Sequence, residues 1–398
     1  MPVVKPKAEG WTARLRAGPL WLVMWSLPLW AAVAPRLLRH KTPWLVDFKS
    51  VLCAAGRWNS HQAIYSASAS CGGVNDSQFV YPPWVADVLG YPVSWLGEGA
   101  VLAAYACFFL AVLVFLFWLV FWRPMNGADR PARAPFLGFT SGNLVFVGNI
   151  AVVLQAGIVA AAIFLGAETI ACTAAIVLAG LVKPIYLTFL TVPAFSTANW
   201  RRRIGLVVVA AGVVAGLCLS RLPLVPEWRA FVLQVAVDPH PGGGLLGWLG
   251  QLGVTAHPVL GVVYLLYAAL LFGAGLVIAE TARLSAAQRV WLALAVGVLL
   301  LPRIMAYDLL LIGPGLLVAS QAASTFSSRV GERASALWLT ACGLYLVSSL
   351  LGGVFQIGHS LALVLVAGGM MWLGGFMLAK VRRPGPDLAA PDVNAPAS

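Results

Sequence analysis

Long hydrophobic runs recur from one end of this chain to the other. Many hold roughly 18 or more residues, the length at which a helix can cross the hydrocarbon core of a membrane. The 398 residues are 60% hydrophobic and 10% charged, whereas a soluble domain carries about 25% charged residues. We therefore expect an all-α, polytopic integral membrane protein, with a single transmembrane domain at 1–383 and a disordered cytoplasmic tail at 384–398.

The distribution of charge predicts the orientation of the chain. The net charge is +12, but the cations fall in short clusters between apolar runs. This is the positive-inside pattern, and it argues against nucleic-acid binding. Clusters such as 201–203 and 380–383 mark cytoplasmic segments. Both termini are then cytoplasmic, the first run at about 19–38 is a retained span, and 39–98 is the first external loop.

Two long helices or four part-length segments could fill the apolar region between about 134 and 200. Each of two long helices would hold roughly 29 residues, well above the ~20 that a span needs. We prefer four segments, with breaks at Gly142–Asn143 and Lys183–Pro184, because broken helices are tolerated where they line a cavity. Another break is expected at Pro302–Arg303. The total is about ten to twelve segments, and these breaks face the outer side.

Cations predicted at the outer membrane surface run against the positive-inside rule. They need a partner, and a lipid phosphate or diphosphate is suitable. Lys183 and Arg303 are the strongest candidates, because ionisable residues within apolar regions are costly and usually functional. The alternative for Lys183 is snorkelling to the membrane surface. Other outer cations, for which loop charge or head-group anchoring is the alternative, are Arg36, Arg39, Lys41, Lys49, Arg57, Arg221 and Arg229.

Asp47 is the candidate catalytic base. It follows the apolar stretch 43–46 in a chain with only 14 acidic residues. A partly desolvated carboxylate has a raised pKa and can accept a proton from a sugar hydroxyl. The alternative is a structural ion pair with Lys49 or Arg57. Competing carboxylates in the same loop are Asp76, Asp87 and Glu98.

Aromatic residues follow Asp47 along the external loop. Interfacial belts of Trp and Tyr explain many of them, but aromatic faces also stack on sugars, so Tyr65 and Tyr81 are candidate sugar or acceptor ligands. Tyr307 and Asp308, near the last break, are further candidates. Asp308 could instead neutralise Arg303.

Two of the six cysteines share the external loop. Cys53 and Cys71 could form a disulfide if this loop faces an oxidising compartment, although the sequence fixes no distance between them. The other four lie in apolar runs and are expected to be buried hydrophobes. The sequence contains no CxxC or His/Cys metal spacing and no Asp-x-Asp pair near the candidate site, so we expect metal-independent chemistry.

The external loop resembles that of glycosyltransferase family 87. The resemblance rests on Asp47-Phe48-Lys49, on Gly56 to Tyr65, and on Phe79 to Trp84 with Tyr91-Pro92. Gly142-Asn143, Lys183-Pro184 and the run Pro302 to Asp308 are similar to later family elements, in preserved order from about 40 to 320. The last run departs from the His-containing late loop of family members that build phosphatidylinositol mannosides.

The resemblance implies a GT-C fold and a polyprenyl-phosphate donor carrying mannose or a similar sugar. Transfer would take place on the outer side of the bacterial inner membrane, to a lipid or glycan acceptor, and Asp47 matches the family's catalytic aspartate. A secondary transporter or lipid flippase is the alternative. The predicted inverting site comprises Asp47 as the base; Lys183, Arg303, Arg57 and Lys49 as donor-phosphate ligands; and Tyr65, Tyr81, Asn143, Tyr307 and Asp308 as sugar or acceptor ligands.

Overall fold

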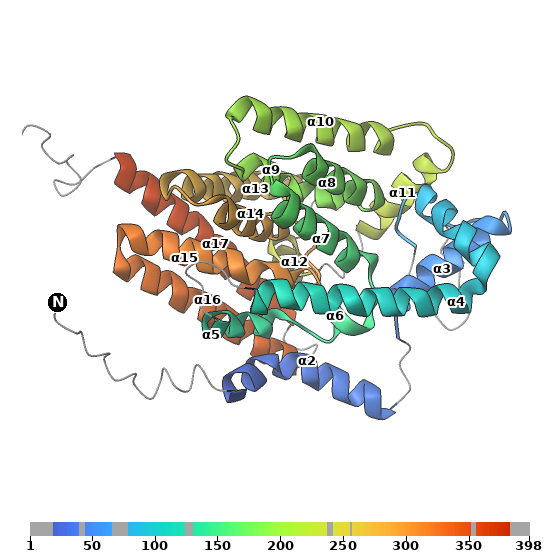
Figure 1. The fold of residues 1–398 in the computed structure, drawn as a ribbon, viewed down its shortest axis with the longest axis horizontal. Helices are drawn as coiled ribbons and strands as arrows, with labels where there is room; N and C mark the ends of the chain where they lie inside the picture. Colours follow the sequence, from blue (N-terminus) through green and yellow to red (C-terminus); the bar gives the residue numbers. More distant parts are fainter. Residues whose placement is uncertain are drawn as a thin grey trace, which may run out of the picture.

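The computed structural model describes residues 19–39, 44–65, 79–123, 130–236, 242–254, 257–351 and 356–382. Within these ranges the protein is helical, and the β-type pairing found there is one isolated antiparallel bridge between Gly243 and Ile304. Most of the longer helices run roughly along the long axis of the molecule (Figure 1). The tail predicted at 384–398 lies outside the described residues.

Five helices in the described ranges are long and apolar enough to cross a membrane. They are α4 (Pro83–Phe117) with its π-helical extension η1 (Trp118–Trp122), α13 (His257–Thr281), α15 (Ile312–Phe326) with the 3-10 turn η5 (Leu309–Leu311), α16 (Ser328–Leu351) and α17 (Gln356–Arg382). Five apolar helical stretches of 10–17 residues accompany them. These lengths support a helical membrane protein, but they do not confirm the expected count of about ten to twelve spans.

The remaining elements are shorter or less apolar. They are α2 (Pro19–Arg39), α3 (Val46–Asn59), α5 (Arg130–Arg133), η2 (Ala134–Phe139), α6 (Asn143–Phe146), α7 (Ile150–Ala160), η3 (Ala161–Gly166), α8 (Ile170–Val182), η4 (Pro184–Leu190), α9 (Thr191–Phe195), α10 (Trp200–Cys218), α11 (Val225–Ala236), α12 (Leu245–Gln251) and α14 (Ala286–Leu299).

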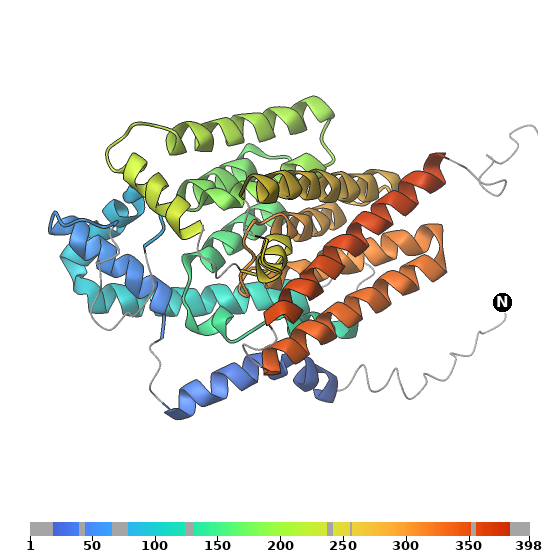
Figure 2. The same ribbon diagram turned by 180° about the vertical axis from the view of Figure 1, so that it is seen from behind.

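The core is built around α14. Every residue from Arg289 to Leu299 is buried, and the helix packs against α15, α9 and η4. On the other side of the bundle α17 packs against α13 and α16, as Figure 2 shows. Helices α10 and α2 lie at opposite edges of the molecule (Figures 1 and 2). Exposed apolar residues on both helices, such as Val209 and Trp30, suit a surface that faces lipid.

The segment expected to be an external loop is largely helical. Within it, α3 packs against the first part of α4, and both lie at one end of the molecule (Figure 1). Gly97 interrupts α4 with φ 77° and ψ 156°, a conformation that glycine adopts without strain. Residues 83–96 therefore point in a different direction from the apolar part of α4 that follows Gly97. They pack against α3 at one end of the molecule.

The helix breaks lie close to their expected positions. Lys183 is extended between α8 and η4, and residues 300–308 separate α14 from η5. At the first break α6 begins at Asn143, and a Cβ on the preceding Gly142 would lie 2.2 Å from Ala32 Cβ of α2. The breaks at Lys183 and after α14 bring polar residues into the interior.

Candidate active site

The first turn of α3 is fixed against the chain that follows α6. The N–H of Leu45 donates to Phe146 O at 2.7 Å, and that of Asp47 donates to Val147 O at 2.9 Å. Gly148, with φ 62°, approaches so closely that a Cβ there would lie 2.5 Å from Leu45 Cδ2. Only glycine leaves room for this contact. The backbone of Asp47 is thus held in place by an adjoining segment.

Asn149 links the Asp47 carboxylate to two tyrosines. Its Oδ1 caps α7 by accepting from the N–H of Ala151 at 2.8 Å, and it accepts from the Tyr81 hydroxyl at 3.2 Å. Since Oδ1 is an acceptor in both contacts, Nδ2 is the donor. It lies 2.5 Å from Asp47 Oδ2 and 3.1 Å from the Tyr307 hydroxyl oxygen. The amide therefore orients the carboxylate and engages one of its oxygens.

Lys183 reaches the same cluster from the break between α8 and η4. It is extended (φ −146°, ψ 95°) and precedes Pro184, which has no N–H to continue the helical hydrogen bonds. Its Nζ lies 3.5 Å from the Tyr307 hydroxyl oxygen. The ring centroids of Tyr307 and Tyr186 are 5.5 and 5.7 Å away, within the range of cation–π interactions. Two aromatic rings thus hold the ammonium group near Asp47.

Asp308 forms the deepest part of the cluster and is 1% exposed. Its Oδ1 accepts from Gln155 Nε2 at 2.6 Å and from the Tyr186 hydroxyl at 3.5 Å. Its Oδ2 accepts from the N–H of Met305 at 2.8 Å. Both carboxylate oxygens of Asp308 bind protein groups, and the side chain is almost fully buried. Asp308 therefore supports the site and is not placed to contact a substrate.

Burial shifts the pKa values of Asp47, Asp308 and Lys183, which lie outside the five long apolar helices. It raises the pKa of Asp47, and this effect outweighs the Asn149 hydrogen bond and the charge of Lys183, which lower it. Burial likewise raises the pKa of Asp308 to about 6. It lowers the pKa of Lys183 despite the two nearby carboxylates. Asp47 is therefore a stronger base than an exposed aspartate.

Arg303 is exposed and lies beside the cluster, in the otherwise largely buried loop 300–308 between α14 and η5. Residues Gly242–Gly244, here called the glycine strap, pair with this loop: Gly243 N–H donates to Ile304 O at 2.7 Å, and Ile304 N–H donates to Gly243 O at 3.3 Å. A Cβ on Gly242 would lie 2.7 Å from Arg303 Cγ. The positive charge of Arg303 disfavours protonation of Lys183, as expected for two cations close to one site.

The predicted aromatic residues take different places around the cluster. Tyr81 and Tyr307 both contact Asn149. Tyr65 lies one step further out, where its hydroxyl donates to Tyr81 O at 2.7 Å. The side chain of Asn143 lies outside the described part of the structure. The structure thus brings Asp47, Lys183, Tyr81, Tyr307 and Asp308 together, with Arg303 beside them.

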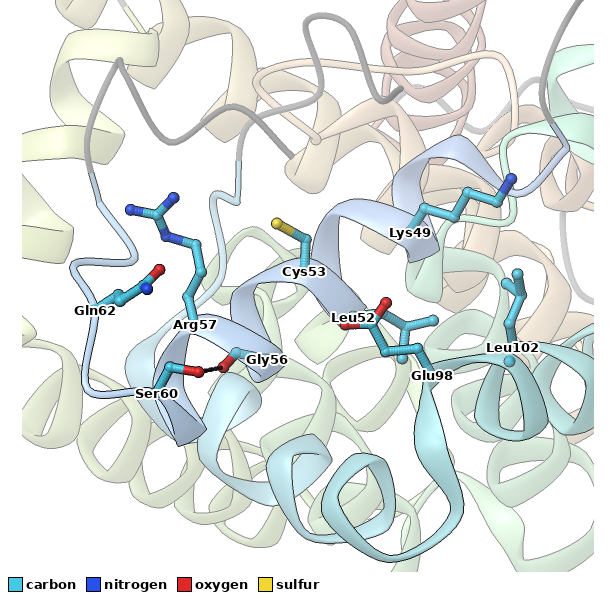
Figure 3. Close-up of a pocket in the computed structure, with 10 residues that line it drawn as sticks. Lys49, Leu52, Cys53, Gly56, Arg57, Ser60, Gln62, Glu98 and Leu102 are labelled. Atoms are coloured by element: carbon cyan, nitrogen blue, oxygen red, sulfur yellow. Dashed lines mark hydrogen bonds between the residues drawn. The ribbon is translucent and has the colours of Figure 1, made fainter. Parts of the chain in front are cut away.

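Lys49 and Arg57 are not part of this cluster. Both line a separate cavity between α3 and the start of the apolar run of α4, and Figure 3 shows them near opposite ends of this cavity. Helical positions advance by about 100° per residue, so Lys49 and Arg57 are turned well away from Asp47. Cys53, between them, is disulfide-bonded. Its predicted partner Cys71 lies outside the described residues, so that pairing stays a prediction.

Three supporting residues were missed by sequence reasoning. Asn149, Gln155 and Tyr186 are neutral residues in or beside apolar runs, and hydropathy does not single them out. A signal for Asn149 existed: it follows Gly148 and precedes an apolar run, which is typical of a helix N-cap. Its contact with Asp47 has no such local signal.

The arrangement combines an oriented carboxylate with a cation held a short distance away. Such a pair can take a proton from one group and stabilise negative charge on another. Among the described residues, no group of three His, Cys, Asp or Glu side chains could hold a metal ion. No protein-family model matches the chain, and no curated protein or solved structure is significantly similar to it.

Proposed function

We propose that this protein is a membrane glycosyltransferase that uses a polyprenyl-phosphate sugar, with mannose as the expected sugar. The proposal rests above all on one observation. Asp47 and Lys183, 136 positions apart in the sequence, meet through Asn149 and Tyr307 in one polar cluster of an otherwise apolar chain. The carboxylate can accept a proton from the acceptor hydroxyl, and the ammonium can stabilise the phosphate that leaves the sugar.

In the proposed reaction Asp47 accepts the proton of an acceptor hydroxyl. Its Oδ2 is engaged by Asn149, which leaves Oδ1 for this proton. The acceptor oxygen forms a bond to the anomeric carbon as the bond from that carbon to the phosphate oxygen breaks, with inversion. The lipid phosphate leaves with the bonding electrons. Lys183 and Arg303 stabilise its charge, so the step is expected to need no metal ion.

We place this chemistry on the outer side of the bacterial inner membrane. In this arrangement the long and short apolar stretches make up about ten to twelve part-length segments of a GT-C-like bundle. Both termini are cytoplasmic, and the ends that carry Asp47, Lys183 and Arg303 face outward. The acceptor is a lipid or glycan at that surface.

Transfer of labelled sugar by the purified full-length protein tests the proposal. Radiolabelled polyprenyl-phosphate mannose is supplied with a membrane lipid extract as acceptor, and label in new products is measured. We expect Asp47→Asn to lower the rate by at least about a hundredfold, because a general base contributes about 10²–10⁴. The matched control is Asp87→Asn. The Asp87 carboxylate accepts from Trp58 Nε1 at 3.0 Å, a bond that an amide oxygen can also accept, so transfer should persist.

A secondary transporter or lipid flippase is the competing function, because it would also place charged residues at breaks in apolar helices. The same protein in sealed vesicles separates the two. Movement of the donor lipid between leaflets, without any glycosylated product, would support the competing function. Full transfer activity in Asp47→Asn would overturn Asp47 as the base.

A further inference from the structure

A cavity of about 690 Å³ lies between α3 and α4, away from Asp47. Its polar lining includes Lys49, Arg57 and Glu98, and its apolar lining includes Leu52 and Leu102. In Figure 3 Lys49 and Arg57 leave α3 near opposite ends of the cavity and their charged ends point away from each other, while Glu98 approaches α3 from α4. The cavity therefore combines charged and apolar walls, as expected for a ligand with a charged head and an apolar tail.

The described lining of the cavity carries a net positive charge. Salt bridges in the described part of the chain join Glu280 to Arg203 and Arg289, and none of them involves Lys49, Arg57 or Glu98. Two cations and one carboxylate leave a net positive cavity. Gly56 lets the carboxylate approach α3, since a Cβ there would lie 3.1 Å from Glu98 Oε1. An anionic ligand would supply the missing negative charge.

Arg57 is held in position to bind a phosphate. Its Nε donates to Ala63 O at 2.8 Å, and its own carbonyl accepts from the N–H of Gln62 at 2.9 Å. His61, with φ 54°, turns the chain back to make these contacts. Neither terminal nitrogen of the guanidinium donates a hydrogen bond to a described residue, and this planar group suits two parallel bonds to phosphate oxygens.

The cavity adjoins the start of a membrane-crossing run. Glu98 and Leu102 belong to the first turns of α4 after its interruption at Gly97. Just before Gly97, Trp95 is 86% exposed and Leu96 is 65% exposed. An exposed Trp beside an apolar helix is typical of the membrane–water interface. A ligand at this position would therefore lie at the level of the lipid head groups, beside the apolar side chain of Leu102.

We propose that this cavity binds the head group of an anionic phospholipid whose head group carries hydroxyls. Arg57 binds the phosphate, Lys49 adds positive charge at the other end of the cavity, Glu98 accepts a hydrogen bond from a head-group hydroxyl, and the acyl chains extend past Leu102. The site is separate from the Asp47 cluster. The proposal therefore does not depend on the proposed transferase activity and goes beyond it.

Native mass spectrometry of the purified full-length protein tests this site with phosphatidylglycerol as the probe. Phosphatidylcholine, which has no net charge, and phosphatidic acid, which has no head-group hydroxyl, are the comparison lipids. We expect phosphatidylglycerol to bind about tenfold more tightly than either. Arg57→Gln should weaken it about tenfold, as loss of a hydrogen bond to a charged group does, and Lys49→Gln, which removes a more distant positive charge, should weaken it severalfold. The matched control, Arg221→Gln, changes an exposed cation outside the cavity and should bind normally.

Lys49 makes no described side-chain hydrogen bond or salt bridge, so Lys49→Gln should keep the unfolding temperature of the parent and remain informative if Arg57→Gln folds poorly. Glu98→Gln should remove the preference for phosphatidylglycerol over phosphatidic acid. Equal binding of all three lipids, or unchanged binding in Lys49→Gln, would overturn the proposal. Displacement of phosphatidylglycerol by millimolar inorganic phosphate would overturn the lipid assignment and identify a free-phosphate site.

Discussion

Asn149 Nδ2 donates to Asp47 Oδ2 over 2.5 Å, and the orientation of this amide is fixed from its other end. There Oδ1 accepts from the N–H of Ala151 and from the Tyr81 hydroxyl. A flipped amide would place Nδ2 against the N–H of Ala151, which is itself a donor, so this contact fixes which end of the amide faces Asp47. The neutral amide fixes the position of the proposed catalytic carboxylate and lowers its pKa, against the larger effect of burial.

Asn149→Ser should shift the pH dependence of transfer. Serine can still cap α7, but its side chain is too short to reach Asp47. The hydrogen bond from Asn149 lowers the pKa of Asp47, so its loss raises that pKa and the acid limb of the kcat/KM profile moves to higher pH. We also expect kcat/KM to fall about tenfold, as for one lost hydrogen bond to a charged group. An unmoved acid limb would contradict this role.

Lys183→Met should act mainly on the leaving phosphate. Methionine fits between the rings of Tyr186 and Tyr307 but carries no charge, so kcat should fall about 10²–10³-fold, as when one transition-state donor is removed. Lys183→Arg keeps the charge and should lose less. The measurement is single-turnover transfer with saturating donor. If Lys183→Met and Lys183→Arg lowered kcat equally, Lys183 would act through its shape and not through its charge.

Hydropathy and cation clusters predicted a helical membrane protein with a first helix at about 19–38, because both are local properties of the sequence. They also located the breaks at Lys183 and before Asp308, where proline and charge interrupt apolar runs. They did not predict α3 or α12. Helix α3 lies in a polar stretch that was expected to be a loop, and α12 has only seven residues.

The same limits apply to the candidate site. Asp47, Lys183 and Asp308 were found because charges are rare in this chain. The helical conformation of α3 was not anticipated, so the sequence alone could not separate Lys49 from Asp47 by their faces. Asn149 lies 102 positions from Asp47, and pairing at that separation depends on how α3 and α7 pack.

Asp308 should make stability depend on pH below neutrality. Its folded-state pKa is raised from 3.8 to about 6, so between these values the folded protein binds more protons than the unfolded chain. Its contribution to the free energy of unfolding therefore falls as pH rises through this window, by up to about 3 kcal/mol. In Asp308→Asn that dependence should disappear. Thermal unfolding of both proteins from pH 4 to 7 measures it, and parallel curves would contradict the assignment.

Gly242→Ala should disturb Arg303 through the glycine strap. The added Cβ would lie 2.6 Å from Ile304 O and 2.7 Å from Arg303 Cγ, so the loop must shift. We expect transfer to fall about tenfold, the effect of about 1.4 kcal/mol in the transition state. The matched control is Gly261→Ala, where a Cβ meets nothing within 4 Å. Equal activity of the two variants would show that the strap does not position Arg303.

Glu280→Gln should destabilise the opposite end of the bundle without changing the site. Glu280 binds Arg203 at 2.6 Å and Arg289 at 2.8 Å, and Arg289 also donates to Phe195 O at 3.1 Å from a buried position. Removing the carboxylate leaves the Arg289 charge buried and less well compensated. Because Glu280 is 45% exposed, we expect a loss of only about 1–2 kcal/mol. The loss is measured by thermal unfolding of Glu280→Gln and of the control Glu332→Gln, which changes an exposed glutamate of α16. Equal unfolding temperatures would show that the two arginines are held by their backbone contacts alone.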